Sequence, residues 1–309
     1  MGFRVLLRMA ALVGLCAPAL SALAQEAPAQ ASPPCARPDA LGVSRVLEVN
    51  PKGGLKVGLK SYPQTLALEP GEVVLTFDDG PLPATTGPIL KALEDECVKA
   101  TFFLIGRNAE AHPAFVARER ARGHTVAHHT YSHPFITMRG LGEAEAKADI
   151  EQGFAADDRA AFGQAGPAPR TPFFRYPGFA DTPELNAWFA RRDVAIFGAD
   201  LWASDWLDMS PQKTLELLLG RLDQAGKGIV LLHDTRPQTA KMLPDLLRAL
   251  KARGYRIVHM VPAKDDAPTP LAKAGPGWTS EAEASIAKVW PKILAEKRRL
   301  AKAAHAPGG

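Results

Sequence analysis

The sequence has few of the features that mark disulfide scaffolds, nucleic-acid-binding proteins or integral membrane proteins. It contains only 3 cysteines in 309 residues and 7% aromatic residues, and its net charge is a mild +4. No Lys/Arg cluster lies in the central region, so nucleic acid is not an expected partner. No apolar run is long enough for a comfortable membrane span. With 46% apolar and 23% charged residues, the composition is that of a soluble globular protein with one large domain or two small ones.

The first 24 residues have the pattern of a secretion signal. Arg4 and Arg8 supply positive charge, residues 9–23 are apolar and rich in alanine, and residues 22–24 form a small-x-small cleavage site. We therefore expect cleavage after Ala24, export to the periplasm or the extracellular space, and no stable membrane insertion of the mature chain. The alternative is an uncleaved N-terminal anchor.

Cleavage would remove Cys16 and leave two cysteines, Cys35 and Cys97. An even number in an exported chain is compatible with one disulfide, and the alternative is two unpaired thiols. A bridge would close a loop of 62 residues (97 − 35). Such a loop is worth about 4 kcal/mol by the chain-entropy argument, and the bridge would hold the N-terminal extension on the core.

Composition divides the chain into four regions. The signal peptide (1–24) is followed by a Pro-, Ala- and Gly-rich extension (25–70) with one expected strand at 43–49. The main domain spans 71–262, and a tail rich in Pro, Ala and Lys spans 263–309.

The tail contains one candidate helix, at residues 279–302. Its apolar residues lie on one side: Ile286, Val289, Trp290, Ile293 and Leu294. An accessory helix packed on the domain is the first interpretation, and a partner-binding or wall-binding helix is the alternative. The basic run at 297–299 is interpreted as a solvated helix face.

Apolar strands alternate with amphipathic helices throughout the main domain. We expect strands at 73–77, 100–105, 125–127, 173–175, 194–197, 229–232 and 255–258, and helices at 86–96, 114–122, 143–162, 183–192, 211–225 and 240–252. This alternation predicts an α/β fold of parallel strands joined by right-handed crossovers. About seven units in fewer than 200 residues favour a distorted, incomplete (β/α) barrel over an open sheet, although the pattern alone does not decide between them.

Polar residues gather directly after these strands. They form five groups in chain order: Asp78-Asp79-Gly80, His129-Thr130-Tyr131-Ser132-His133, Arg175-Tyr176-Pro177-Gly178, Ser204-Asp205-Trp206 and His233-Asp234. Each group alone has an ordinary explanation, such as an Asp-Gly turn, a surface histidine pair or a rim salt bridge. Because the carboxyl ends of parallel strands open into one crevice, we expect the five groups to form a single site.

The residue types in these groups suit a catalytic metal site. Two histidines four residues apart and one carboxylate would leave a metal with open positions for water and substrate. Two adjacent carboxylates need a nearby cation, and the guanidinium of Arg175 would hold one of them ionised. His233 is a natural acid or base, and Trp206 offers a flat apolar face to a sugar ring. We interpret His128 as a structural neighbour of the ligands.

The five groups resemble the motifs of the nodulation-type polysaccharide deacetylases, carbohydrate esterase family four. The matching segments are Thr76-Phe77-Asp78-Asp79-Gly80, His129-Thr130-Tyr131-Ser132-His133, Arg175-Tyr176-Pro177, Asp205-Trp206 and Leu231-Leu232-His233-Asp234. The resemblance covers roughly residues 71–262 and implies a distorted (β/α) barrel. Two positions depart from the family pattern, since Gly178 stands where many members have Tyr and Val230 stands at a Leu.

The resemblance also implies roles for individual residues. Asp78 would be the general base, oriented by Arg175, and His233 the general acid, supported by Asp205. One divalent metal ion, most often zinc, would be held by three ligands: Asp79, His129 and His133. Leu231 would lie in the apolar pocket for the acetyl methyl group, and the other substrate-binding residues would be Tyr176, Pro177, Gly178 and Trp206. The backbone N–H of Tyr176 or Gly178 is a candidate donor to the oxyanion.

The implied activity is hydrolysis of acetamido groups on N-acetylated sugars of a polysaccharide, with release of acetate. Peptidoglycan, chitin-type oligomers and poly-N-acetylglucosamine all present such a group, and the sequence does not choose among them. One alternative keeps the fold but cleaves acetyl esters on xylan or small cyclic amides. The other is a non-catalytic carbohydrate-binding wall protein.

Overall fold

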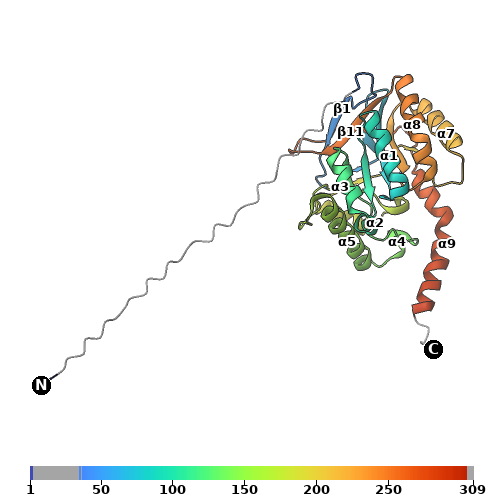
Figure 1. Cartoon of the computed structure of the whole chain (residues 1–309). Helices are drawn as coiled ribbons and strands as arrows, with labels where there is room; N and C mark the ends of the chain where they lie inside the picture. Colours follow the sequence, from blue (N-terminus) through green and yellow to red (C-terminus); the bar gives the residue numbers. More distant parts are fainter. Residues whose placement is uncertain (3–34, 36, 305–309) are drawn as a thin grey trace. The chain divides into compact units, whose positions relative to one another are not determined.

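The computed structural model describes residues 1–2, 35 and 37–304 (Figure 1). The expected signal segment and its cleavage site lie outside these residues. The described residues from 35 onward belong to one compact unit. None of the described helices is both long and apolar enough to cross a membrane.

A ten-stranded sheet forms the centre of this unit, and its described ladders are all parallel. Its strands are β1 (Arg45–Val49), β2 (Lys56–Val57), β4 (Glu72–Asp78), β5 (Thr101–Leu104), β6 (Thr125–His128), β7 (Phe173–Phe174), β8 (Ala195–Phe197), β9 (Leu201–Trp202), β10 (Gly228–His233) and β11 (Arg256–Pro262). The order is β1-β11-β4-β5-β6-β7-β8-β2, and β10 lies between β4 and β9. No ladder in the described chain joins β9 to β2, so the ring of strands is not closed. The predicted α/β class is confirmed.

Helices cover the outside of this sheet (Figure 1). They are α1 (Pro83–Asp95), α2 (Gly106–Ala111), α3 (Pro113–Ala121), α4 (Thr137–Gly140), α5 (Glu143–Phe162), η1 (Pro177–Phe179), α6 (Pro183–Ala190), α7 (Pro211–Ala225), α8 (Pro237–Ala252) and α9 (Glu281–Ala304). The bounds of α5 and α7 are those expected from the sequence. For α7 the reason is local, since the Ser210 side chain accepts from the Lys213 amide (3.2 Å) and Gly226 ends the helix at φ 70°.

Alternation along β4 explains why this strand is apolar throughout. Val73, Leu75 and Phe77 face outwards into the core between the sheet and helices α1 and α8. Val74 faces inwards and packs with Phe103 and with the other interior side chains. Each fully buried side chain of this size stabilises the fold by about 1.5–3 kcal/mol. Asp78 lies four residues after Val74, so the same alternation places it on the interior face, at the carboxyl end of the strand.

The extension before the main domain is part of the same fold from residue 37 onward. β1 pairs with β11, β2 pairs with β8, and β3 (Gln64–Leu66) forms a small antiparallel sheet with β12 (Leu271–Lys273). The structure joins Cys35 to Cys97 in a disulfide, with the two Cα atoms 5.6 Å apart. The extension is therefore fixed both covalently and through strand pairing.

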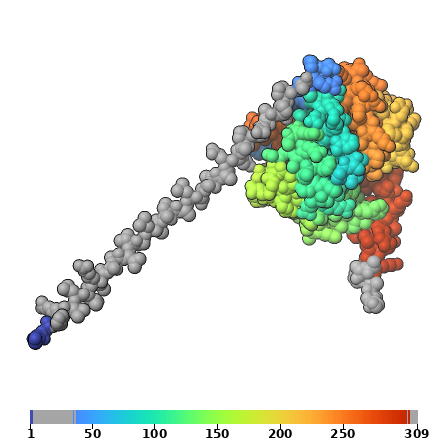
Figure 2. Space-filling model, viewed as in Figure 1, coloured from blue at the N-terminus to red at the C-terminus, as the bar shows by residue number. Residues whose placement is uncertain are grey.

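The tail helix α9 packs against α4 and η1 by its first half. Ala282, Ile286 and Ile293 of this helix are buried. The second half extends beyond the body of the molecule, as the red helix in Figures 1 and 2 shows. A helix is therefore present in the tail, packed on the domain.

Candidate metal centre and active site

Two adjacent aspartates stand where β4 ends. Asp78 is the last residue of the strand, and Asp79 follows in the left-handed region at φ 79°. The Asp79 amide donates to the Phe103 carbonyl (3.1 Å), and the Asn108 side chain donates to the Asp79 carbonyl (2.7 Å). These bonds hold the turn in a conformation that a non-glycine residue rarely adopts. They place the Asp79 carboxylate beside the loop after β6.

Gly80 completes this turn because no side chain fits there. A Cβ at Gly80 would lie 2.0 Å from an oxygen of the Asp234 carboxylate. The close approach packs the turn after β4 against the turn after β10. The glycine of the Asp-Asp-Gly segment is thus required by packing at the site itself.

His129 leaves β6 with its imidazole fixed in one tautomer. Its Nδ1 lies 2.7 Å from the Arg175 carbonyl oxygen. Since a carbonyl only accepts, Nδ1 carries the proton and Nε2 keeps its lone pair. Nε2 points towards Asp79, with 3.6 Å to Oδ1. Burial, together with the charge of neighbouring His133, lowers the pKa of His129 to about 3, so the ring is neutral, as a metal ligand must be.

His133 reaches the same point through a shaped loop. Thr130 and His133 both have positive φ, 69° and 47°, and the Thr130 hydroxyl accepts from the His133 amide (3.1 Å). Ser132 donates from its amide and its hydroxyl to Asp149 on α5, both at 2.9 Å. These bonds place His133 Nε2 3.5 Å from Asp79 Oδ1.

Asp79, His129 and His133 fit a metal ion. One ligating atom from each lies within 4.8 Å of the others. Ligands held about 2.0–2.1 Å from a tetrahedral zinc stand about 3.3 Å apart, close to the 3.5 and 3.6 Å measured here. Asp79 Oδ1 is buried and has no hydrogen-bond partner, a costly state without a cation. The expected ligand set is therefore brought together in the geometry that a metal needs.

Arg175 orients the other carboxylate, Asp78. Its Nη1 lies 2.6 Å from Asp78 Oδ1, and the guanidinium sits 4.1 Å above the Phe103 ring. Its remaining donors reach the Thr76 hydroxyl (2.9 Å) and the carbonyls of residues 197 (3.2 Å) and 198 (2.9 Å). Burial raises the pKa of Asp78, and the charge of Arg175 opposes this. Asp78 is thus a fixed carboxylate with improved proton affinity.

His233 and Asp205 form a second buried pair. His233 Nδ1 lies 2.7 Å from Asp205 Oδ1, and the His233 amide donates to Oδ2 of the same carboxylate (2.7 Å). The Thr239 hydroxyl also donates to Oδ2 (2.6 Å). Burial lowers the pKa of His233, but the charge and hydrogen bond of Asp205 outweigh it and raise the pKa to about 9. His233 is therefore protonated at neutral pH, and it is in register with Asp78 on the neighbouring strand.

The residues expected to bind substrate differ in how far their side chains are exposed. Trp206 is 38% exposed, and its ring centroid lies 5.8 Å from that of His233. Leu231 is buried two residues before His233, on the same face of β10. Pro177 is buried at the start of η1, and Gly178 is exposed at φ 60°. The Tyr176 ring is buried and its hydroxyl donates to Asn186 (3.1 Å), so Tyr176 offers the site only its backbone.

Four supporting residues were given no role from the sequence, although Thr76 stands in the first motif. Thr76, Asn108, Asp149 and Thr239 each position a site residue from a separate element. Alternation could have identified Thr76, which lies on the same face as Asp78. The other three are single polar residues far away in sequence, with no spacing that marks them.

His128 faces away from the metal ligands. It is fully buried, with Nδ1 2.8 Å from Asp157 Oδ2 on α5. Its ring packs edge-on against Phe154 of the same helix (4.7 Å). This position agrees with the structural role expected from the sequence.

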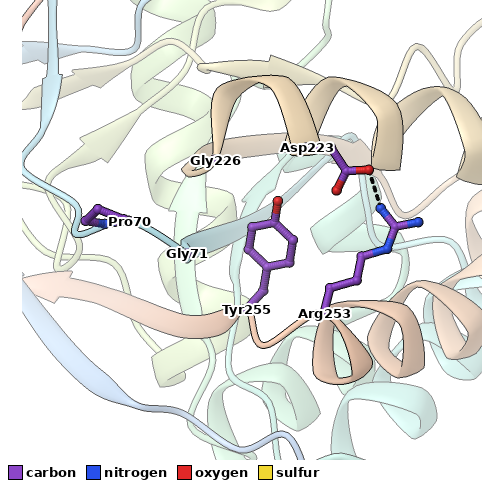
Figure 3. Close-up of a pocket in the computed structure, with 6 residues that line it drawn as sticks. All are labelled: Pro70, Gly71, Asp223, Gly226, Arg253 and Tyr255. Atoms are coloured by element: carbon purple, nitrogen blue, oxygen red, sulfur yellow. Dashed lines mark hydrogen bonds and ion pairs between the residues drawn. The ribbon is translucent and has the colours of Figure 1, made fainter.

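A recess at the other end of the barrel is not part of this site (Figure 3). Its lining residues are Pro70, Gly71, Asp223, Gly226, Arg253 and Tyr255. They lie just before β4, β10 and β11, whereas Asp78 and His233 lie where β4 and β10 end. A strand of seven residues separates its ends by about 20 Å. In Figure 3 Asp223 and Arg253 face each other across an ion pair of 2.5 Å.

Fold and site together define a class of protein: an incomplete parallel (β/α) barrel with a single candidate metal centre, among the described residues, at the carboxyl ends of its strands. Residues 66–187 match the polysaccharide deacetylase family. The chain is 31% identical over 219 residues to the chitin deacetylase of Colletotrichum lindemuthianum. The aligned region covers 67% of this chain and 84% of that protein. The chain belongs to the polysaccharide deacetylase family, as its motifs predicted.

Bacterial relatives extend the comparison. The chain is 30% identical over 201 residues to the peptidoglycan-N-acetylmuramic acid deacetylase PdaC of Bacillus subtilis, covering 64% of this chain but only 40% of that protein. A solved peptidoglycan deacetylase of Bdellovibrio bacteriovorus superimposes with a TM-score of 0.63 at 28% identity, covering 74% of this chain and 62% of that one. The chain thus spans less than half the length of the Bacillus relative.

Proposed function

We propose that this protein hydrolyses acetamido groups on N-acetylated sugars of a polysaccharide, in a metal-dependent reaction that releases acetate and leaves a free amine. The observation that carries the proposal is the cluster of Asp79, His129 and His133, with its unpartnered buried oxygen, beside the Asp78–Arg175 and His233–Asp205 pairs. Relatives named as peptidoglycan and chitin deacetylases support this class of substrate.

The three ligands suit a divalent ion, most often zinc in such a set. When bound there, the metal would polarise the acetamido carbonyl and lower the pKa of a bound water to about 7. His129 contributes a neutral ring in a fixed tautomer, and Asp79 contributes the negative charge.

Asp78 is the general base in this scheme. It accepts a proton from the attacking water, and Arg175 keeps the carboxylate in place during the transfer. Because the other three polar contacts of Arg175 are with Thr76 and two carbonyls, the guanidinium has no freedom to follow the proton. The donor to the oxyanion is a backbone N–H of the segment after Arg175, with Tyr176 and Gly178 as candidates.

His233 is the general acid. An amine is a poor leaving group, so it must be protonated as the carbon–nitrogen bond breaks. A pKa of about 9 keeps the imidazole charged at neutral pH, and Asp205 holds it through Nδ1, which leaves Nε2 to donate. This favours an amide over an ester, since an ester needs less help from an acid.

The place of action that we propose is the periplasm or the extracellular space. The signal pattern at residues 1–24 supports export, and the disulfide between Cys35 and Cys97 fits an oxidising compartment. Polysaccharide substrates outside the cytoplasm are consistent with both features.

Acetate release from N-acetylglucosamine oligomers tests the activity. The chain from Gln25 onward is assayed with chelator, with zinc restored, and as the variants Asp78→Asn and His129→Ala. Glu216→Gln, at an exposed position on α7, is the matched control and should keep full activity. We expect release that requires metal and disappears in both site variants.

Other substrates decide between the alternatives. Release from acetylated xylan, with none from the oligomers or from peptidoglycan, would overturn the amide assignment in favour of an esterase. Metal binding without release from any of the three would indicate a carbohydrate-binding protein.

A further inference from the structure

The part of α9 from Lys288 to Lys302 is strongly basic. Its cationic residues are Lys288, Lys292, Lys297, Arg298, Arg299 and Lys302, and all six are exposed. We refer to these six residues as the basic arm. Helix geometry spreads them over about 21 Å, since each residue adds about 1.5 Å. In Figure 2 the end of α9 projects from the body.

Positive charge is concentrated in this segment. Residues 286–304 contain six Lys or Arg and one acidic residue, Glu296, which gives a net charge of +5. The whole chain carries +4, so the rest of the sequence carries −1 (4 − 5). Glu296 pairs with Arg299 at 2.6 Å, and the other five cations form no ion pair within the described part of the chain. The arm therefore supplies the chain's whole excess of positive charge.

The base of the arm is attached to loops that carry site residues. Arg139 of α4 forms ion pairs with Glu283 of α9 and with Asp181, which follows η1. α4 begins four residues after His133, and η1 begins two residues after Arg175. α9 contacts both elements, and its residues Ile286 and Ile293 are buried. The helix that carries the arm is thus fixed to two elements that closely follow site residues in the chain.

The composition of the arm favours a polyanion over a membrane. The exposed large apolar residues of α9 are Val289 (46%) and Leu300 (45%). Two such side chains bury too little apolar surface to hold a helix in a bilayer. Five unpaired cations attract an anionic chain over its whole length.

We propose that the basic arm binds carboxylate groups on the substrate polymer and thereby increases the affinity of the enzyme for that polymer. This rests on the proposed deacetylase function and narrows its substrate class. A glycan that carries carboxylates, as peptidoglycan does through its peptides, is favoured over a neutral chitin-type chain. The arm acts on substrate binding and takes no part in the chemical step.

A matched pair of triple variants tests the proposal. The arm variant is Lys297→Gln, Arg298→Gln and Lys302→Gln. The control variant, Arg191→Gln, Lys213→Gln and Lys241→Gln, removes the same three charges from exposed positions on the body. Acetate release is measured on soluble peptidoglycan fragments that retain their peptides and on neutral N-acetylglucosamine oligomers.

We expect the arm variant to raise KM on the peptide-bearing fragments about tenfold at low salt, with kcat unchanged. KM on the neutral oligomers should stay the same, and the control variant should match the wild type on both. Because the attraction is screened, about 0.5 M salt should remove most of the difference. An equal change on both substrates, or an equal effect of the control variant, would overturn the proposal.

Binding without turnover separates this inference from the proposed function. Co-sedimentation with insoluble peptidoglycan, in chelator, should be weaker for the arm variant than for the wild type and the control. That result supports the arm even if no substrate is deacetylated. Equal sedimentation of all three proteins would refute the arm, as would binding to anionic phospholipid vesicles in place of peptidoglycan.

Discussion

Replacing Asp205 by asparagine tests the general acid most directly. A pKa of about 9 for His233, against an ordinary value of 6.5, means that its surroundings favour the charged ring by about 3 kcal/mol. Burial alone lowers this pKa, so Asp205 supplies most of the stabilisation and also offsets burial. The asparagine would keep the size of the side chain but lose the charge. The pKa of His233 should then fall to 6.5 or below.

The effect on activity follows from the fraction of protonated histidine. With a pKa of 6.5, only about 3% of His233 is protonated at about pH 8, so kcat/KM should fall about 30-fold or more at that pH. The assay is kcat/KM between about pH 5 and pH 10. The wild type should lose activity above about pH 9, and Asp205→Asn should lose it at 6.5 or below. The control is Asp208→Asn, an exposed carboxylate three residues away.

Stability gives a second reading of the same pair. A histidine whose pKa is raised on folding contributes stability that is fully present below pH 6.5 and is lost as the pH rises through about 9. Urea unfolding of the wild type should show this decline, and Asp205→Asn should not. An unchanged alkaline limb in Asp205→Asn, together with normal folding, would refute the assignment of His233 as the acid held by Asp205.

Three further predictions follow from the site. Adding zinc to chelated protein should stabilise the fold by about 4 kcal/mol when the zinc concentration is about 1,000 times Kd, and calorimetry should show a higher thermal midpoint. His129→Ala should abolish this increase. Arg175→Lys keeps the charge but loses the hydrogen bonds to two backbone carbonyls, so it should lower the free energy of unfolding by about 3 kcal/mol. The control Arg191→Lys, at the surface, should leave this free energy unchanged. Equal urea midpoints for the two variants would contradict this prediction. Burial raises the pKa of Asp234 to about 7, so the stability of the metal-free protein should fall as the pH rises from about 4 to about 7. Asp234→Asn should therefore be more stable than the wild type at about pH 8, by up to about 4 kcal/mol, and no more stable at about pH 4. A gain in stability at both pH values would contradict the ionisation argument.

The sequence was sufficient to predict the long helices and strands, because each spans enough residues to show a periodic apolar pattern. β4, α5 and α7 have apolar patterns, caps or flanking glycines that set their bounds. Strands of two or three residues, such as β2 and β9, have no period and were not predicted. Their place depends on backbone partners that come from distant parts of the chain.

The site followed the same division. Residues at strand ends were predicted because topology gathers such ends at one rim. The contacts of Arg175 with the carbonyls of residues 197 and 198 were not, since main-chain acceptors leave no mark in a sequence. The direction of Tyr176 was open to prediction: Phe174 and Tyr176 alternate with Arg175, so an inward Arg175 places the Tyr176 ring on the outer face.

Arg175 uses its two ends for two different parts of the site. Its carbonyl sets the tautomer of His129, and its guanidinium orients Asp78. A substitution that shifts this one backbone position would therefore change the affinity for metal and the basicity of the carboxylate together. The two properties cannot be altered one at a time at this position. In a lineage of such enzymes, changes of metal preference and of pH optimum should appear as linked events.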